Sequence, residues 1–342
     1  MKREFLMLAH KFTDDPIGGW FCSEKLNGMR AYWDGGISRG LKKIDIPWAN
    51  TDKDERYKDY QVCTGLWSRL GNVLHAPDWW LDTMPQMPLD GELWIGRRQR
   101  QSLMKIVKDL DNLNWGPVKY MVFETPAYEM MFDGSMLPWG KQALLGPLES
   151  QKIGYSPKPN TPFWAKVDLM KEKLHEHNLI KIVDQVRLPW SKFDAYPLIE
   201  KMLLPDACVN QGIEGYMLRS PDVGYECCRS HRLLKAKPWQ IGKGKVIGYT
   251  YGKGKFYGMM GALVIETIVD IEGYDPKSVI LELSGFTDQE RRLSDSTCEP
   301  NECKKSVREG VTAVAFPMNS EVSYKFNDTS EDGVPQEARY MR

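Results

Sequence analysis

A change in sequence pattern after Lys237 constrains the fold of this chain more than any other feature. From Pro238 onward, short runs of β-branched and aromatic residues alternate with turns that are rich in glycine and polar residues. We expect strands over 246–251, 260–271, 279–283, 311–316 and 321–326, and a short helix over 286–292. Five or six short strands in about 105 residues favour a small β-barrel. The chain is therefore predicted to form two domains, 1–237 and 238–342.

The first 237 residues carry both helix and strand patterns, so we expect an α+β domain there. Apolar residues at helical spacing predict helices over 99–110, 163–178 and 196–204. Strands are predicted over 21–33, 62–66, 89–95, 118–123, 181–186, 214–219 and 233–236. Two of these runs are interrupted by turn dipeptides, Asn27-Gly28 and Asp90-Gly91. The polar segment 44–60 and the Pro- and Gly-rich segment 125–162 are predicted to be irregular.

The amino-acid composition excludes several classes of protein function. The 46 basic and 46 acidic residues cancel, so any binding of nucleic acid must use local patches rather than bulk charge. The seven cysteines are scattered and form no CxxC pair, which argues against a disulfide framework or a zinc site and favours a reducing compartment. The apolar run Phe5–Ala9 is too short for a signal-peptide core or a membrane span. We expect a cytoplasmic monomer without membrane association.

Lys25 is the first residue that we consider for chemistry. It follows a predicted strand and precedes the turn dipeptide Asn27-Gly28 and then Arg30, so its backbone is held in place. A lysine amine has a reference pKa of about 10.4 and is therefore a poor nucleophile at neutral pH. Burial or neighbouring cations favour the uncharged amine and can make it reactive.

Polar and aromatic residues downstream of Lys25 suit a nucleotide site. Ser68 and Arg69 offer a hydroxyl and a guanidinium, which together can grip a phosphate. Glu92 lies on a strand beside a turn, where a carboxylate can accept hydrogen bonds from ribose hydroxyls. Phe123 ends an apolar strand and can stack on a purine.

Two further elements complete the set. Glu214 is a strand-borne acid that can offer oxygen ligands to a divalent metal. Lys235 and Lys237 alternate on one predicted strand and therefore point to the same face, where they can bind phosphates. Taken singly, each of these residues is more typical of a solvated surface, a polar loop, a strand end or a core than of a nucleotide site. The inference depends on their combination and order.

In combination these residues resemble the covalent nucleotidyltransferase superfamily, and specifically the ATP-dependent DNA ligases. The family's nucleophile motif Lys-x-Asp-Gly-x-Arg is matched by Lys25-Leu26-Asn27-Gly28-Met29-Arg30. The remaining elements follow in the family's order as Ser68-Arg69-x-Gly71, Asp90-Gly91-Glu92, Phe123-Glu124, Glu214-Gly215 and Leu233-Leu234-Lys235-x-Lys237. The last 105 residues resemble the family's oligonucleotide-binding (OB) barrel at Gly252–Lys255, Gly258–Leu263, Gly285–Asp288 and Asp332–Pro335. These segments resemble the minimal two-domain ligases of bacteria and their phages.

The resemblance implies a fold, a reaction and a role for each residue. It implies an ATP-grasp-like nucleotidyltransferase domain of antiparallel sheets with helices, followed by an OB-fold β-barrel. Lys25 would attack the α-phosphate of ATP and expel pyrophosphate, and the AMP would pass to the 5′-phosphate of a nick in duplex DNA before the 3′-hydroxyl attacks. It implies that the nucleotide is bound by Arg30, Arg69, Glu92, Phe123, Lys235 and Lys237. It also implies that Mg²⁺ is bound by Glu214 and Glu92.

The sequence departs from the family pattern at three places. Asn27 replaces the usual Asp, which removes a negative charge beside Lys25, and we expect activity with an altered pH dependence. The family's C-terminal basic motif has only Arg339 and Arg342 as candidates. The excursion between Gly35 and Cys63 is longer than a minimal ligase needs.

Contacts to DNA are expected from Ser68 and from a local basic run in the second domain. That domain contains 13 basic and 16 acidic residues, so binding there must be local and salt-sensitive. The run consists of Lys243, Lys245, Lys253 and Lys255. Alternatively, these four lysines are the solvated side chains of a hairpin and contact no DNA.

Other functions use the same residues. An RNA ligase or a GTP-dependent mRNA-capping guanylyltransferase would use the same nucleophile and the same metal chemistry. We favour a DNA ligase over these two because the second domain resembles the barrel of minimal DNA ligases. A non-catalytic nucleic-acid-binding protein, in which Asn27 marks a decayed site, is a third reading. It predicts no adenylylation at any pH.

Overall fold

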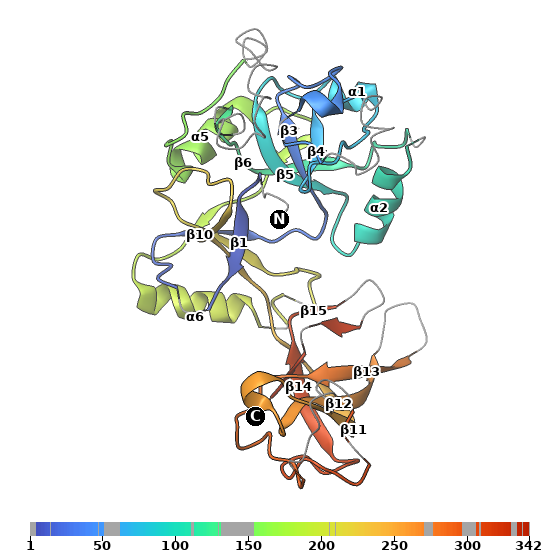
Figure 1. The fold of residues 1–342 in the computed structure, drawn as a ribbon. Helices are drawn as coiled ribbons and strands as arrows, with labels where there is room; N and C mark the ends of the chain where they lie inside the picture. Colours follow the sequence, from blue (N-terminus) through green and yellow to red (C-terminus); the bar gives the residue numbers. More distant parts are fainter. Residues whose placement is uncertain are drawn as a thin grey trace. The chain divides into compact units, whose positions relative to one another are not determined.

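The computed structural model describes all residues except 1–4, 14, 47, 51–61, 111–112, 129, 131–153, 205, 209, 270–275, 296–305, 308, 330–333, 337 and 342. The chain divides into two compact units, Met1–Lys237 and Pro238–Arg342 (Figure 1). Both units are built on mainly antiparallel sheets, and the described helices lie mostly in the first. This confirms the predicted α+β class. No helix in the described part of the chain is both long and apolar enough to span a membrane.

The first unit contains two five-stranded sheets. The first sheet has the order β1(Leu8–Lys11), β10(Arg229–Ala236), β9(Tyr216–Arg219), β2(Phe21–Glu24) and β8(Val186–Arg187). The second sheet has the order β4(Leu66–Ser68), β3(Met29–Asp34), β5(Pro88–Trp94), β6(Lys119–Glu124) and β7(Ile180–Ile182). Neighbouring strands are antiparallel except in the pairs β1–β10 and β6–β7.

The segment around Asn27-Gly28 is not the hairpin that its turn dipeptide predicts. β2 pairs with β9 and β8, whereas β3 pairs with β4 and β5, so the two strands belong to different sheets. The chain crosses between the sheets at this point. A Cβ on Gly28 would lie 2.2 Å from the carbonyl oxygen of Leu93, so only glycine fits there. The crossing places Lys25 between the two sheets.

Two other strand predictions need correction. The run 89–95 is one continuous strand, β5, and Asp90-Gly91 marks a register shift against β6 instead of a turn. A Cβ on Gly91 would lie 2.6 Å from the carbonyl oxygen of Met121, so the glycine allows the close pairing of the two strands. The run 181–186 is divided between β7 and β8, which lie in different sheets.

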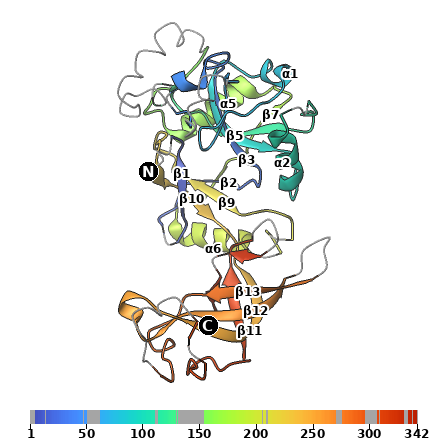
Figure 2. The ribbon, with the colours of Figure 1, turned by 45° about the vertical axis from the view of Figure 1, so that its right-hand side comes forward.

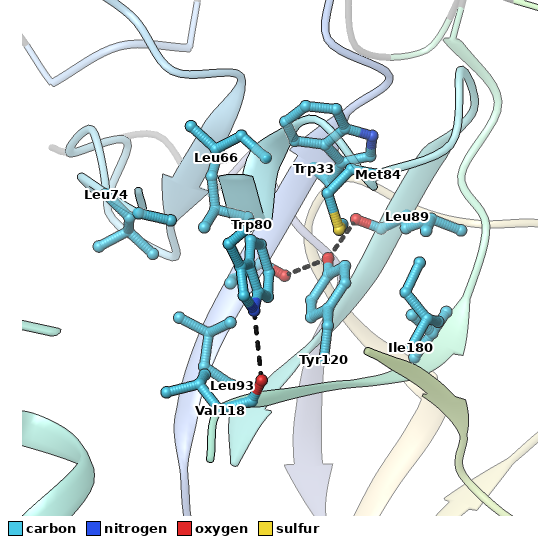
Figure 3. Close-up of a cluster of buried hydrophobic side chains, with 14 of the residues drawn as sticks. Trp33, Leu66, Leu74, Trp80, Met84, Leu89, Leu93, Val118, Tyr120 and Ile180 are labelled. Atoms are coloured by element: carbon cyan, nitrogen blue, oxygen red, sulfur yellow. Dashed lines mark hydrogen bonds between the residues drawn. The ribbon is translucent and has the colours of Figure 1, made fainter. Parts of the chain in front are cut away.

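The second sheet packs against the largest apolar core of the unit (Figure 3). Helices α1(Asp78–Leu81), α2(Arg100–Lys108) and α5(Phe163–Leu174) contribute buried residues to it. Two of its aromatic residues are hydrogen-bonded to the backbone: Trp80 Nε1 donates to the carbonyl of Val118 at 3.2 Å, and the Tyr120 hydroxyl donates to the carbonyl of Leu89 at 2.7 Å. Buried hydrogen bonds of this kind hold β5 and β6 at fixed positions beneath the site.

The first sheet is covered by α6(Lys192–Met202), whose Ala195 and Ile199 pack with Leu218 and Leu234 of the sheet (Figure 1). The helix begins before the predicted start at Tyr196, because Ser191 acts as its N-cap and accepts a hydrogen bond from the backbone N of Phe193.

The second unit is one five-stranded antiparallel sheet with a short β-ribbon. Its order is β13(Lys277–Leu283), β12(Met260–Val269), β11(Gln240–Tyr251), β14(Glu321–Phe326) and β17(Arg339–Tyr340). Figure 2 labels the first three of these strands. The ribbon pairs β15(Asp328–Thr329) with β16(Pro335–Gln336). Within the described residues the two sheet edges meet only in the short contact between Ser284 and Arg339, so the predicted barrel is present as a curled sheet.

Two predictions fail in the second unit. Residues 286–292 form a single turn and no helix. Thr287 and Glu290 pair reciprocally, as at the start of a helix, but the carbonyls of Arg291 and Arg292 accept hydrogen bonds from the backbone N of Met260 and Val314, so the turn does not continue. Residues 311–316 form isolated bridges at Ala313 instead of a strand. Arg342 and the Asp332-Gly333 pair lie outside the described residues.

Candidate active site

A cavity of about 290 Å³ opens between the two sheets of the first unit. This volume is close to the lower end of the range of about 300–1,000 Å³ that is typical of small-molecule sites. Strands of both sheets contribute to its walls. Six of the residues predicted from the sequence line it, namely Lys25, Arg30, Arg69, Glu92, Phe123 and Lys235.

Lys25 reaches the cavity from the crossing between the sheets. Its backbone N donates to the carbonyl of Gly215, and its Nζ donates to Glu214 Oε2 at 2.6 Å. The other carboxylate oxygen of Glu214 lies 2.8 Å from Nζ of Lys237. Glu214 therefore bridges the two lysines, and both of its oxygens are ion-paired. Lys237 follows the end of β10, so it contacts the site through Glu214, whereas Lys235 lines the cavity wall.

Glu92 stands near Lys25 on β5. Its Oε1 accepts a hydrogen bond from the backbone N of Gly28 at 3.2 Å, which ties the crossing segment to the second sheet. Burial raises the pKa of Glu92 to about 7, against the opposing pull of Lys25 and Arg30. The carboxylate therefore lies close to two cations in a poorly solvated position.

Arg30 is fixed between Asp90 and Phe123. Its Nε and Nη2 donate to the two carboxylate oxygens of Asp90 at 2.8 and 2.6 Å, a bidentate arrangement. Its guanidinium lies 4.8 Å from the centre of the Phe123 ring. Burial alone would lower the pKa of Arg30, but Asp90 outweighs it and raises the pKa. The guanidinium therefore orients Phe123 at the wall of the cavity.

The sequence patterns did not identify a buried ion network on the same wall. Glu124 is almost fully buried and accepts from Lys166 Nζ at 3.0 Å and from Nε of Arg219 at 3.1 Å. Burial would raise the pKa of Glu124, but Arg219 and Lys166 lower it overall. The hydroxyl of Tyr225 donates to Asp90 Oδ2 at 2.6 Å. A lysine at an apolar helix position was the only available signal for Lys166.

Ser68 and the lysines of the second unit lie elsewhere. Ser68 is buried in β4, where its Oγ accepts from the backbone N of Asn72 at 3.0 Å. The four predicted lysines, Lys243, Lys245, Lys253 and Lys255, are all exposed. Lys243 forms an ion pair with Glu321 at 2.8 Å, and Lys255 Nζ lies 4.6 Å from the ring centre of Phe256.

The carboxylates of the site do not form a metal cage on their own. In the described parts of the chain, no group of three or more His, Cys, Asp or Glu side chains could hold a metal ion. Magnesium is commonly bound by only one or two carboxylates together with substrate phosphates. Glu214 and Glu92, beside Lys25, are compatible with that mode.

Comparison with known proteins agrees with this geometry. Residues 251–342 match a family model described as a DNA ligase OB-like domain. A DNA ligase of Haemophilus influenzae is 24% identical over 339 residues, which covers 98% of this chain and 91% of that protein.

Solved structures extend the likeness to the whole fold. A structure from a study of DNA binding with a minimal scaffold in Lig E DNA ligases is 25% identical, covers 98% of both chains and has a TM-score of 0.56. The structure named Pmar-Lig_PreS3 is 22% identical, with a TM-score of 0.58, 99% of this chain covered and 67% of that chain. In the order of its motifs, in their convergence on one cavity and over nearly its whole length, the chain is similar to these DNA ligases.

Proposed function

We propose that the protein is an ATP-dependent DNA ligase that seals nicks in duplex DNA through a lysyl-AMP intermediate on Lys25. The observation that carries this proposal is the convergence of residues from six separate sequence elements on one cavity. Five of those elements supply lining residues, and the sixth supplies Glu214, which is bonded to Lys25. Residues that lie more than 200 positions apart, such as Lys25 and Lys235, meet there.

The reaction needs positioning and charge neutralisation more than acid–base chemistry. On this proposal the Nζ of Lys25 forms a P–N bond to the α-phosphate of ATP, and the bond from that phosphorus to the pyrophosphate oxygen breaks. Glu214 Oε2, 2.6 Å from Nζ, holds the amine at the cavity until the nucleotide arrives. Lys235 and Lys237 contact the α-phosphate, and Lys237 would leave Glu214 to do so.

The other wall binds the nucleoside. Phe123, held by Arg30, offers an aromatic face for adenine, and Glu92 accepts hydrogen bonds from the ribose hydroxyls. Arg69 is exposed at the cavity, where its guanidinium can contact sugar or phosphate. When bound with the phosphates of ATP, Mg²⁺ would be held by Glu214 and Glu92 and would neutralise developing charge.

We further propose that residues 1–237 are the adenylyltransferase domain and residues 238–342 the OB-fold domain. The exposed lysines 243, 245, 253 and 255 of the second unit are proposed to contact DNA phosphates.

The decisive test is intact mass spectrometry after incubation with ATP and Mg²⁺. The wild-type protein should gain the mass of one AMP, on a peptide that contains Lys25, and Lys25→Ala should gain none. The matched control is Lys173→Ala, which removes an exposed lysine on α5 and should keep the adduct. An AMP adduct on Lys25→Ala would refute the assignment of the nucleophile.

Substrate assays separate the remaining alternatives. Adenylylation by ATP and sealing of nicked duplex DNA are expected. Transfer from GTP would favour a capping guanylyltransferase, and sealing of nicked RNA alone would favour an RNA ligase. The absence of any nucleotide adduct at every pH tested would favour the non-catalytic reading that Asn27 raises.

A further inference from the structure

Three large apolar side chains that lie close together in the sequence, at the edge strand of the first sheet and the start of the helix that follows it, are exposed. Val186 lies on the edge strand β8, and Trp190 and Phe193 lie where the chain enters α6. Their exposed fractions are 62%, 71% and 78%. A cluster of exposed large apolar residues is typical of an interaction site.

The indole of Trp190 is held in place despite its exposure. A Cβ on Gly19 would lie 2.4 Å from Cε3 of the indole, and a Cβ on Gly18 would lie 2.2 Å from the carbonyl oxygen of Trp190. The backbone N of Gly19 also donates to the carbonyl of Pro189 at 2.8 Å. Gly19 therefore leaves room for the ring, and Gly18 lets the two backbone segments approach each other closely. Such packing fixes the ring and leaves most of it open to a partner.

Cations accompany these aromatic rings. The guanidinium of Arg187 lies 4.4 Å from the ring centre of Trp190 and 5.4 Å from that of Phe21. The Nζ of Lys192 lies 5.3 Å from the ring centre of Phe193. Aromatic rings interleaved with cations are the arrangement with which proteins bind single-stranded nucleic acids, because bases stack on the rings and phosphates pair with the cations.

The cluster is continuous with the cavity. Phe21, which Arg187 covers, packs edge-on against Phe163 with ring centres 5.4 Å apart, and Phe163 lines the cavity. Gln185, two residues before Arg187, also lines it. A polymer whose reacting end enters the cavity would therefore pass over this edge of the sheet.

We propose that Trp190, Phe193 and Arg187 form a docking surface for a nucleic-acid strand, in which an unpaired base stacks on Trp190 and the strand's phosphates contact Arg187 and Lys192. This inference rests on the proposed ligase function and adds a contact outside the nucleotide cavity. It gives the protein a preference for nicks with unpaired nucleotides beside them over fully paired nicks.

The test measures the affinity for a short labelled single strand and for a nicked duplex with an unpaired flanking nucleotide. Because base–aromatic stacking is a strong contact, Trp190→Ala should weaken both by about 10-fold, and Trp190→Phe should retain most of the affinity. Trp79→Ala removes another exposed tryptophan, on α1, and should leave affinity unchanged. Arg187→Gln should reduce the salt dependence of single-strand binding, lowering its logarithmic slope by about 0.7.

Adenylylation of Lys25 by ATP needs no nucleic acid and serves as the internal reference. It should be unchanged in every one of these variants. A wild-type protein that forms no AMP adduct would refute the ligase proposal. The binding measurements would still decide whether Trp190, Phe193 and Arg187 form a docking surface for a nucleic-acid strand.

Unchanged affinity in Trp190→Ala overturns the docking surface. If that variant does not fold, Phe193→Ser provides the same test, since its ring is the most exposed of the three. Unchanged affinity together with a change in sedimentation mass would also overturn the proposal, because it would identify the surface as a contact with a second protein molecule.

Discussion

The two units of the molecule place charge differently. The first unit buries Asp34, Asp90, Glu124, Lys166 and Arg219, each with no more than 3–4% of its surface exposed. In the second unit, the buried ionic residue within the described ranges is Arg291. Its Nη1 donates to the backbone carbonyls of Met260 and Gly261, both at 2.7 Å, whereas carboxylates are the partners of the buried cations Lys166 and Arg219 in the first unit.

This difference in the burial of charged residues shows that the first unit carries the free-energy cost of buried ions and the second unit largely does not. Burying a charge costs free energy unless partners compensate it, and a buried ion pair rarely stabilises a fold more than apolar residues of the same size would. In the first unit the buried networks of Asp90 and Glu124 form part of the cavity wall, where they hold Arg30 and Arg219. The second unit has an apolar core, and its Lys243, Lys245, Lys253 and Lys255 are exposed, as the proposed contacts with DNA require.

Removing one partner of a buried network should have the largest effect. Lys166→Met keeps the length of the side chain and leaves Glu124 with Arg219 as its only cationic partner in the network. Breaking a buried ion pair in this way costs about 3–5 kcal/mol. Chemical denaturation, followed by a probe in the first unit, measures the loss.

Lys173→Met is the matched control for Lys166→Met, because it removes an ion-paired lysine from the exposed side of the same helix. Its stability should equal that of the wild type. Equal losses in the two variants would break the contrast between buried and exposed charge.

The buried carboxyl of Asp34 should make the stability of the first unit depend on pH, which tests the contrast between buried charge in the first unit and exposed charge in the second. It is fully buried at the end of β3 and accepts hydrogen bonds from Ser38, from Trp67 Nε1 at 2.9 Å and from the backbone N of Gly36 at 2.9 Å. Burial nevertheless raises its pKa from 3.8 to about 6. Because the folded state binds the proton more tightly than the unfolded state, this carboxyl stabilises the fold below pH 4, and that contribution is lost as the pH rises to about 6.

Asp34→Asn removes this titration. The stability of the wild type should fall by about 2 kcal/mol relative to the variant between pH 4 and pH 7, since one pKa unit corresponds to about 1.4 kcal/mol and the unfolded carboxyl is already partly ionised at pH 4. Thermal or chemical denaturation of both proteins across that range gives the difference. Parallel curves for the two proteins would show that Asp34 is not the buried acid that titrates.

Much of the fold was predictable because strand patterns are local. Alternating apolar residues and turn dipeptides indicated most strands, and the helix over 99–110 lies close to the observed α2. The pairing was not predictable, because Asn27-Gly28 has the composition of a hairpin turn but links strands of different sheets. The predicted helix over 286–292 is a single turn, because the backbone carbonyls of Arg291 and Arg292 bond to distant parts of the chain, which the local pattern does not reveal.

The site shows the same division between local and distant information. Motif residues such as Lys25, Glu92 and Lys235 were identifiable because each lies in a short, ordered element, and the structure brings them to one cavity. Lys166 and Tyr225 belong to no such element. They matter because tertiary packing places them on Glu124 and Asp90, and only a three-dimensional structure reveals that contact.

The smallest effect is expected at an exposed pair in the second unit. Lys243 and Glu321 form an ion pair in which both side chains are 67% exposed. Exposed pairs contribute little to stability, so Glu321→Gln should leave the denaturation curve within experimental error. Glu321 raises the pKa of Lys243 through its hydrogen bond and charge, and it also competes with phosphates for the ammonium group.

Glu321→Gln should therefore increase affinity for nicked duplex DNA a few-fold at low salt, and the gain should vanish at high salt because the contact is electrostatic. Glu282→Gln makes the same change of net charge at an exposed position on β13 and controls for it. Equal gains in the two variants would mean that overall charge, and not a free Lys243, governs binding. A gain confined to Glu321→Gln would show that the second unit binds DNA through individual exposed lysines, in contrast to the buried networks of the first unit.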